Sequence, residues 1–337
     1  MEITMDSKRI SIKDVADMAG VSVSAVSRYL NNGYISTEKR EAIANAITQT
    51  GYVPSRHAQM LRTRKTNIIG VVVPRMNSEA IAKIVDGISS ELSETRYRMI
   101  LAITNNDSEK EIEYVKLFEN NPVDGIILCG TTYTKMHKNL MKKVNVPVVI
   151  VGQQFDDYPC VYYNDYGAAK TITNALIKSG CKKIMCISIT DKNIAFGKNR
   201  INGYKDALKE NGIIPEVELM KEAECSTESG YHIVKAMLSK YDGIDGIVCT
   251  TDYIAVGAIK AIKEKGLDIP GDIQVAGIGH DRISSIVSPN FTTAHLFYRE
   301  SGIEAVRMLR ELINGQSDGI RQLGLGFEIV KGRSTII

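Results

Sequence analysis

The chain has 337 residues, more than a single hydrophobic core usually organises, so we expect two or more domains. Its 44% hydrophobic and 24% charged residues are typical of a globular protein and argue against a disordered or fibrous chain. The formal net charge of +3 is unevenly spread, since residues 1–66 hold ten Lys and Arg against six Asp and Glu and the rest holds 32 against 33. A basic N-terminal part predicts a polyanionic partner, although a solvated charged surface would give the same excess.

Targeting and metal-binding patterns are both missing from the sequence. No stretch approaches the roughly 18 apolar residues of a membrane span, and the segment MEITMDSKRISIKD lacks the apolar part of a signal peptide, so we expect a cytoplasmic protein. The six cysteines include no Cys-x-x-Cys pair and no Cys and His cluster with metal-ligand spacing. We interpret them as reduced core residues and expect neither a metal site nor a cofactor.

Residues 11–33 have the pattern of two short helices joined by a tight turn. Ser11 followed by Asp14 predicts a capped helix start, and the apolar positions of this helix end at Gly20. A second helix fits from about Ser22 to NNG at 31–33, and a third begins after Ser36 and runs through TEKREAIANAITQTGY. This spacing predicts a helix-turn-helix; the alternative is a three-helix domain without a nucleic-acid partner.

The second helix, VSVSAVSRYL, is unusual because serines interrupt its apolar residues. Val26, Tyr29 and Leu30 share the inner side, so the serines face outward. Short hydroxyl and apolar side chains together with arginine can address base edges and phosphates in the major groove of DNA. We therefore expect Val23, Ser24 and Arg28 to lie on a DNA-binding face.

The segments ISIKDVADMAGVSVSAVSRYLNN and GYVPSRHAQMLRTRKTNIIGVVVP closely resemble the head and hinge of the LacI/GalR family of bacterial transcription regulators. The resemblance continues through TTDYIAVGAIKAIKEKGLDIPGDIQVAGIG and SPNFTTAHLFYRESGIEAVRMLRELING. Within the family, the segments VYYNDYGAAK, FGKNRINGY and CTTDYIAVGAIK look most like the repressors of trehalose and sucrose operons. The expected DNA-contacting residues are Ser22, Val23, Ser24, Ser27, Arg28 and Asn31 in the head and Ser55, Arg56, Ala58 and Leu61 in the hinge.

The hinge segment begins at Pro54, a residue that suits the first turn of a helix. Two helical turns in SRHAQML are too short to be stable alone. The resemblance implies that this segment folds on DNA, paired with its twin, and that Leu61 wedges into the minor groove and kinks the duplex. A flexible basic linker is the alternative.

From residue 66 onward, short β-branched runs such as NIIGVVV, DGIILCG and VPVVIVG alternate with helical stretches, which is typical of buried parallel strands. A second set follows with KKIMCISI, GIDGIVCT and DIQVAGIG. We therefore predict an all-α helix-turn-helix head and an α/β periplasmic-binding-protein-like core of two doubly wound parallel-sheet lobes. The expected bounds are 1–53 for the head, 54–66 for the hinge and 67–337 for the core, with lobe 1 at about 67–160 and 292–321 and lobe 2 at about 161–291 and 322–337.

The resemblance also implies an effector cleft between the lobes. Arg200 in KNRINGY occupies the family's Arg-x-x-Gly-aromatic position, where a guanidinium binds sugar hydroxyls or a carboxylate. In GIGHD the acid is displaced to Asp281, so the family's sugar-contacting carboxylate is not clearly inherited, and Asn164 either contacts the ligand or caps a helix. The expected effector-binding residues are Arg75, Gln153, Asn164, Lys198, Arg200, Thr251, Asp252 and His280.

The charge of the effector is left open by the sequence. Arg75 follows the first core strand and precedes a helix start near Ser78, which suits a phosphate or carboxylate, and Lys198 would add positive charge. Gln153 and Gln154 suit sugar hydroxyls better than a phosphate. A sugar phosphate and a neutral disaccharide therefore both stay open.

Motifs of enzyme active sites are absent: the cleft segments hold no Gly-x-Ser-x-Gly, Walker or His-Glu-x-x-His pattern. We therefore expect a homodimeric repressor of a carbohydrate-utilisation operon that binds palindromic operator DNA and is released by a sugar or sugar phosphate. One alternative keeps the fold but acts with a nucleobase or protein corepressor. The other is a sugar-binding protein that does not act on DNA.

Overall fold

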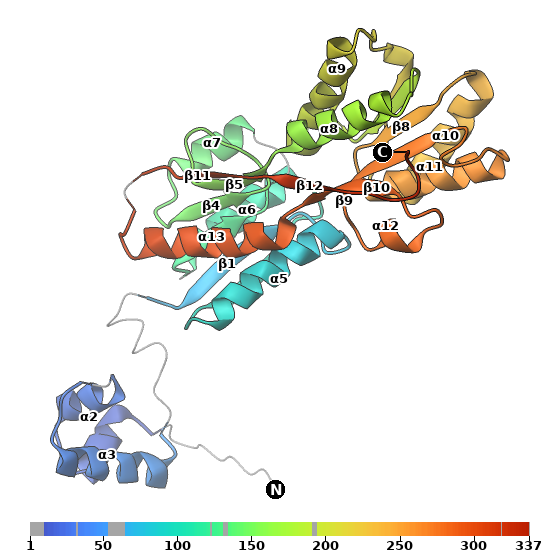
Figure 1. Ribbon diagram of the computed structural model, residues 1–337. Coiled ribbons are helices and arrows are strands. Elements are labelled where there is room, and N and C mark those ends of the chain that lie inside the picture. Colours follow the sequence, from blue (N-terminus) through green and yellow to red (C-terminus); the bar gives the residue numbers. More distant parts are fainter. Residues whose placement is uncertain are drawn as a thin grey trace, which may run out of the picture. The chain divides into compact units, whose positions relative to one another are not determined.

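The computed structural model describes residues 10–31, 33–52, 65–121, 123–130, 134–190, 194–317 and 319–336. The chain divides into two compact units, Met1–Thr66 and Asn67–Ile337, each of which is described by itself (Figure 1). The expected hinge residues Ser55, Arg56, Ala58 and Leu61 lie outside the described residues, so the hinge helix and its wedge stay predictions.

The first unit contains the three expected helices, α1 (Ile12–Met18), α2 (Val23–Leu30) and α3 (Thr37–Thr50). Ser11 and Asp14 cap α1 reciprocally, because the backbone N–H of Ser11 donates to Asp14 Oδ2 at 2.7 Å and the backbone N–H of Asp14 donates to Ser11 Oγ at 3.3 Å. Gly20 has a φ of +64°, which allows the chain to turn sharply before α2. A small core closes the unit, formed by Val15, Ala16, Val26, Ile43, Ala46 and Tyr52.

The second unit contains two six-stranded sheets. The first, in lobe 1, has the order β11-β5-β4-β3-β1-β2, and all of its strand pairs are parallel. Its strands are β1 (Ile68–Val73), β2 (Arg98–Ile103), β3 (Gly125–Leu128), β4 (Val148–Val151), β5 (Cys160–Tyr163) and β11 (Gln322–Leu325). The helices of this lobe are α5 (Glu79–Ser93), α6 (Ser108–Asn120), α7 (Lys135–Met141) and α13 (Tyr298–Ile313).

Lobe 2 is built around the second sheet, with the order β12-β10-β9-β8-β6-β7. Its strands are β6 (Ile184–Ser188), β7 (Met220–Glu222), β8 (Gly246–Cys249), β9 (Gln274–Gly279), β10 (Thr292–Leu296) and β12 (Phe327–Val330). All pairs are parallel except that of β12 with β10, so an antiparallel strand ends this sheet. The helical segments are α8 (Asp165–Lys178), η1 (Ile194–Asn199), α9 (Arg200–Glu210), η2 (Val217–Leu219), α10 (Thr227–Lys240), α11 (Asp252–Glu264) and α12 (Ile283–Ile286).

The chain crosses between the lobes three times: after β5, after β10 and after β11 (Figure 1). These crossings correct the expected lobe bounds by a few residues. Residues 161–163 and 322–325 belong to lobe 1, because β11 pairs with β5 and β5 pairs with β4. Residues 292–296 belong to lobe 2, because β10 pairs with β9. The sequence placed each crossing too early because an apolar strand that continues to the cleft looks the same whichever lobe it pairs in.

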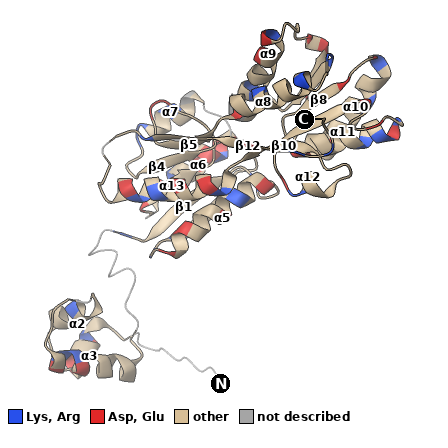
Figure 2. Cartoon of the chain, viewed as in Figure 1, with Lys and Arg blue, Asp and Glu red and all other residues tan. Residues whose placement is uncertain are grey.

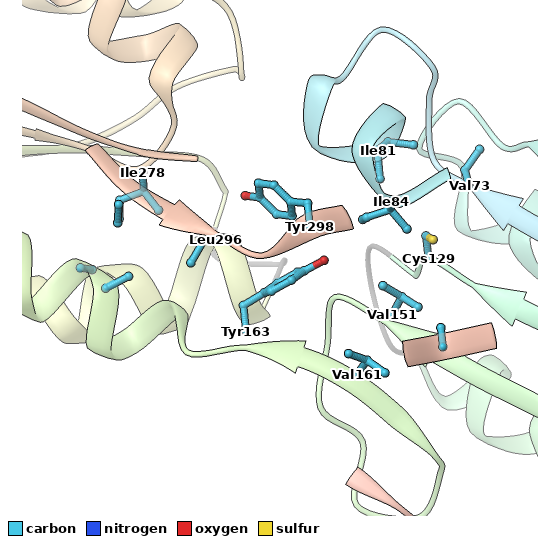
Figure 3. Packing of buried hydrophobic residues seen from close by; sticks show 14 of the residues in the cluster. Val73, Ile81, Ile84, Cys129, Val151, Val161, Tyr163, Ile278, Leu296 and Tyr298 are labelled. Carbon is cyan, nitrogen blue, oxygen red and sulfur yellow. The ribbon is translucent and has the colours of Figure 1, made fainter. Parts of the chain in front are cut away.

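Two tyrosines pack where the lobes meet. Tyr163 at the end of β5 and Tyr298 at the start of α13 meet edge to face, with 5.0 Å between their ring centroids. Figure 3 shows them between Ile278 and Leu296 of lobe 2 and Ile81 and Ile84 of lobe 1. One hydrophobic cluster therefore runs from lobe 1 into lobe 2.

Charged residues of both signs lie along α5 and α13 (Figure 2). Arg299 of α13 pairs with Asp86 of α5 at 2.7 Å, and Arg307 pairs with Glu91 at 3.2 Å. None of the helices in the described part of the chain combines the length and hydropathy that a membrane span requires.

Candidate functional site

The outer side of α2 carries the expected DNA-contacting residues of the head. Ser24 and Arg28 are exposed and Val23 is 42% exposed, whereas Ala25 and Val26 are buried in the head core. The Arg28 Nε donates to the Ser24 carbonyl oxygen at 3.4 Å, which holds the guanidinium along the helix surface. The helix therefore presents one arginine, hydroxyls and an apolar side chain to the solvent.

The other three predicted head residues are the N-cap of α2, Ser22, its C-cap, Asn31, and Ser27 within the helix. Ser22 is exposed and caps the helix by accepting from the backbone N–H of Ala25 at 3.3 Å. Ser27 is partly buried, and the exposed Asn31 donates its side-chain amide to the Ser27 carbonyl oxygen. Ser22 and Asn31 therefore stabilise the two ends of the helix in addition to lying on its accessible side.

The core unit has a cleft where the carboxyl ends of the strands of the two lobes face each other. A cavity of about 930 Å³ lies there, and a smaller one of about 310 Å³ shares part of its lining. The residues common to both are Arg75, Ser78 and Ala80 from lobe 1, Ile189, Phe196, Cys225 and Ser226 from lobe 2, and Tyr298 at a crossing. A ligand in these cavities would contact both lobes at once.

Arg75 and Thr251, two of the expected effector-binding residues, line the cleft cavities, and their contact with an effector stays a prediction. Arg75 is the second residue after β1, is partly buried and lines both cavities. Thr251 lines the smaller cavity, and its hydroxyl caps α11 by accepting from the backbone N–H of Ile254 at 3.5 Å. Thr251 therefore has a helix-capping role in addition to its place at the cavity.

Arg200 also reaches the smaller cavity, but its charge is already paired. Its side chain is 1% exposed, and its Nε and Nη2 both lie 2.7 Å from Asp165 Oδ1. Its Nη1 donates to the Thr250 carbonyl oxygen, and the guanidinium lies 4.9 Å from the centroid of the Phe196 ring. Burial raises the pKa of Asp165, although the Arg200 charge opposes this change. Arg200 is therefore held as one half of a buried ion pair.

Asp252 lies beneath the cavities instead of lining them. It is fully buried, and its two oxygens accept from the backbone N–H of Asp281 and the hydroxyl of Thr293, each at 2.7 Å. Burial, followed by the neighbouring Asp281 carboxyl, raises the pKa of Asp252 to about 7. This carboxyl therefore positions the segment after β9.

The segment after β9 brings Asp281, not His280, to the cavity. Asp281 lines the smaller cavity at 7% exposure, and its Oδ1 has no hydrogen-bond partner among the described residues. Burial raises the pKa of Asp281 to about 6. His280 has a φ of +55° and turns toward His295, with 3.1 Å between the two Nδ1 atoms, and does not line the described cavities. The displaced acid in GIGHD is the sequence signal for Asp281.

The three remaining predicted effector residues lie outside the two cavities. Lys198 is exposed on η1 and lines neither of them. Asn164 caps α8, because its Oδ1 accepts from the backbone N–H of Gly167 at 2.9 Å, and Gln153 donates to the Gly130 carbonyl oxygen at 2.9 Å. Asn164 and Gln153 both line a separate pocket of about 450 Å³. Of the predicted effector residues, the structure thus brings Arg75, Arg200 and Thr251 to the cleft cavities.

Several cavity residues were not predicted from the sequence. They include Phe196, Glu222, Glu224, Cys225 and Tyr298. Glu222 is the last residue of β7, and Glu224 and Cys225 come two and three residues after it. The rule that ligands bind at the carboxyl ends of parallel strands could therefore have predicted these three residues. Phe196 and Tyr298 carry no such local signal, because they reach the cleft from η1 and from a lobe crossing.

Two family models match nearly the whole chain. Residues 11–55 match the bacterial regulatory proteins of the lacI family, and residues 66–329 match the periplasmic binding proteins and sugar binding domain of the LacI family. The sucrose operon repressor of Staphylococcus xylosus is 35% identical over 91% of this chain and 94% of its own. Catabolite control protein A of Priestia megaterium is 29% identical over 91% of this chain and 94% of its own.

The fold has solved counterparts. The lac repressor dimer bound to operator and the anti-inducer ONPF has a TM-score of 0.88 at 24% identity, covering 98% of this chain and 100% of its own. The complex of the transcriptional regulator CelR with cellobiose has a TM-score of 0.75 at 24% identity, covering 97% of this chain and 100% of its own. At 24% identity these likenesses show a shared fold.

Proposed function

Because the chain belongs to the LacI family of bacterial regulatory proteins, we propose that it represses a carbohydrate-utilisation operon in the cytoplasm and that a small sugar-like effector releases it. It is a DNA-binding transcription regulator and not an enzyme. The observation that carries the proposal is the presence, in one chain, of an exposed polar face on α2 and a cavity of about 930 Å³ between two lobes.

DNA recognition follows from the shape of the head. Two copies of α2 in a homodimer would each enter the major groove of one half of a palindromic operator. Val23 and Ser24 at the start of the helix would lie at base edges, and Arg28 one turn later would reach a base or phosphate. In the hinge, Leu61 would insert into the minor groove between the two half-sites.

Release follows from a cavity with walls in both lobes. An effector shifts the balance between two lobe arrangements only by its difference in affinity for them. The lobes are joined at three crossings, and we propose that an effector changes the angle between them and thereby the affinity for DNA. Operator and effector affinities are then linked, and each ligand weakens the binding of the other by the same factor.

The DNA-binding role is tested with Arg28→Ala. A duplex selected from a random library by the full-length protein serves as the operator in a fluorescence-anisotropy titration. We expect Arg28→Ala to lose at least about tenfold in operator affinity, since an arginine contact to a base is worth about 1–3 kcal/mol. Lys39→Ala on α3 removes the same charge from the head and serves as the control. Equal operator affinity of the wild type and Arg28→Ala would contradict the assignment of α2.

The regulatory direction is tested on the same duplex by adding sucrose, trehalose and their 6-phosphates. We expect one of them to release the wild-type protein. Tighter binding to DNA upon addition would favour the corepressor alternative, and no binding to any selected duplex would favour a sugar-binding protein that does not act on DNA.

The charges around the cavity favour a neutral sugar over a sugar phosphate. Among the described residues that line the larger cavity, Arg75 carries the positive charge, while Glu222 and Glu224 carry negative charges. The second arginine at the cleft, Arg200, is neutralised by Asp165 at 2.7 Å. A phosphate would therefore meet one cation and at least two carboxylates.

Calorimetry separates the two kinds of effector. We expect sucrose to bind the wild type at least as tightly as sucrose 6-phosphate, and Arg75→Ala to change both affinities by a similar factor. If instead the phosphate binds at least about tenfold more tightly and loses this advantage in Arg75→Ala, the anionic effector is the correct one.

A further inference from the structure

Two histidines of lobe 2 face each other where the chain leaves β10 for lobe 1. His280 follows β9 directly, and His295 is the next-to-last residue of β10. Their rings meet edge to face, with 3.1 Å between the two Nδ1 atoms and 5.0 Å between the ring centroids. Both side chains are partly buried, and the backbone N–H of His280 donates to the Thr293 hydroxyl at 3.3 Å. We call His280 and His295 the histidine pair.

The short contact between the rings limits how many protons the histidine pair can hold. A ring nitrogen of histidine either carries a hydrogen and donates or lacks one and accepts, so at 3.1 Å one Nδ1 donates to the other. A first additional proton can bind Nε2 of the donating ring, which leaves this hydrogen bond intact. A second must bind the accepting Nδ1, which removes the hydrogen bond and places two positive charges side by side. The pair therefore tolerates one charge but not two.

The surroundings of the histidine pair oppose protonation on balance. Burial is the first cause that lowers the pKa of both histidines, and the Lys83 charge on α5 acts in the same direction. The groups that oppose this change are carboxylates on three neighbouring elements: Glu79 of α5, Glu300 of α13 and Glu328 of β12. The described arrangement thus binds fewer protons than separated histidines, which titrate at about pH 6.5, and it becomes less favourable as the pH falls below that value.

The histidine pair is linked to the contacts that join the two lobes. The His280 carbonyl oxygen accepts from Lys83 Nζ at 2.9 Å, and the backbone N–H of Arg282 donates to both carboxylate oxygens of Glu79, at 2.9 and 3.1 Å. Lys83 and Glu79 belong to α5 of lobe 1, whereas His280 and Arg282 belong to lobe 2. Charging both rings would push His280 away from β10 and place a positive charge near the Lys83 ammonium. One segment therefore carries both a proton-sensitive ring and the junction of the lobes.

From this geometry we propose that the histidine pair makes the junction of the lobes sensitive to pH. While the two rings share a hydrogen bond, residues 280–282 stay bound to α5. When both rings are charged, these residues separate from α5 and the lobes are held less firmly. The proton then shifts the balance between lobe arrangements in addition to the effector, and its influence on operator affinity rests on the proposed repressor function.

Two neutral replacements remove the second charge. His295→Gln keeps a polar side chain beside His280, and His280→Asn suits the φ of +55°, which asparagine adopts more readily than most residues. His232→Gln is the matched control, because His232 is an exposed histidine of α10. The raised pKa values of Asp252 and Asp281 favour the described arrangement at low pH, which is the opposite sign, and both carboxyls are present in every variant. Comparison with the wild type therefore isolates the histidine pair.

The experiment is hydrogen-exchange mass spectrometry of the full-length protein without DNA at about pH 7.5 and about pH 5.5, on either side of the histidine titration. Exchange in peptides that contain residues 279–286 is expressed as a protection factor, which removes the intrinsic effect of pH on the exchange rate. Between the two pH values, we expect protection to fall at least about threefold more in the wild type and His232→Gln than in His295→Gln and His280→Asn. Peptides of α6 in lobe 1 serve as the internal reference.

Operator binding tests whether the change in the lobes reaches DNA. The selected duplex is titrated with each protein at the same two pH values, and the ratio of the two affinities is compared between proteins. This ratio should differ at least about threefold between the wild type and His295→Gln, and it should agree between the wild type and His232→Gln.

Two results would overturn the proposal: an equal fall in protection in the wild type and both neutral variants, or an equal pH dependence of operator affinity in the wild type and His295→Gln. The first would make the histidine pair a packing contact, and the second would separate it from the lobe balance that governs DNA binding. The exchange experiment uses no DNA, so a protein that binds no operator at either pH would contradict the proposed function alone.

Discussion

Asp252 illustrates how a charged residue next to a ligand cavity can serve the protein's architecture. Its two oxygens accept hydrogen bonds from the backbone N–H of Asp281 and the hydroxyl of Thr293. One side chain of α11 therefore contacts both the segment after β9 and β10. The pKa of about 7 arises first from burial and then from Asp281. A carboxyl with a raised pKa keeps its proton in the folded chain at pH values where the unfolded chain has lost it.

The sign of the resulting pH dependence can be tested with Asp252→Asn. The free energy of unfolding of the wild type should fall, relative to that of the variant, as the pH rises from about 4, where an unfolded Asp titrates. The fall should end near the folded pKa of about 7. Urea unfolding at several pH values across this window measures the difference. Exposed Asp156→Asn is the control, and a difference that is constant over the window would contradict the raised pKa.

The position of a single residue could be predicted where its contacts are with residues close to it in the sequence. Ser11, Ser22 and Arg28 were placed correctly because caps and helix faces repeat within a few residues. The pairing of Arg200 with Asp165 joins residues 35 positions apart, and it forms only because α9 packs against α8. No sequence pattern shows this contact, so the sequence presented Arg200 as open to an effector.

Among the helices, α5 and α13 approach so closely that only glycine fits at the contact. A Cβ at Gly87 of α5 would lie 2.0 Å from the Arg299 carbonyl oxygen, and one at Gly302 of α13 would lie 2.2 Å from the Ile84 carbonyl oxygen. Both collisions are with backbone, which cannot move as a side chain can. The two helices therefore form a rigid pair along one face of the lobe 1 sheet (Figure 1).

Gly87→Ala should accordingly destabilise the core unit. We expect the free energy of unfolding to fall by about 1–3 kcal/mol, the usual cost of overpacking, although alanine favours helices more than glycine does. Denaturant unfolding of the full chain measures this loss. Gly319→Ala meets no atom within 4 Å and should leave stability nearly unchanged. Equal midpoints for the two variants would show that α5 and α13 can separate without cost.

Most elements could be predicted from the sequence, but not where they change lobes. The apolar runs after residue 66 predicted both sheets, because buried parallel strands are apolar on both faces. The crossings were misplaced because strand pairing decides them, and pairing is not visible in a single strand. Gln153 and Asn164 line the separate pocket of about 450 Å³ instead of the expected effector site for the same reason, since β4 and β5 end beside β11.

Across the whole core unit, the lobes are fastened to each other beside the cleft. The backbone N–H of Arg282 in lobe 2 donates to both carboxylate oxygens of Glu79 in lobe 1, at 2.9 and 3.1 Å. Lys83 donates to the His280 carbonyl oxygen at 2.9 Å. Both contacts flank Asp281, which lines the smaller cavity. The segment 279–282 therefore touches the ligand cavity and the opposite lobe at once.

Glu79→Ala should loosen this fastening. We expect the amide hydrogen of Arg282 to exchange about tenfold faster, because hydrogen bonds to a charged acceptor are worth about 1.5 kcal/mol or more. Hydrogen-exchange mass spectrometry of peptides that contain residues 279–286 measures this rate. Glu91→Ala, which removes an ion pair between α5 and α13 within lobe 1, is the control. If the amide hydrogen of Arg282 exchanges at the same rate in the wild type and in Glu79→Ala, this contact does not help to hold the lobes together.

One edge strand of each sheet, β11 in lobe 1 and β12 in lobe 2, comes from a single short segment, 322–330. During synthesis this segment leaves the ribosome after every other strand of both sheets. Until then β5 and β10 carry unpaired edges, and an open strand edge is a template for pairing with another chain. The sheets of both lobes are thus completed together, late in synthesis. Until then, an open strand edge in each lobe of the nascent repressor can pair with another chain and aggregate.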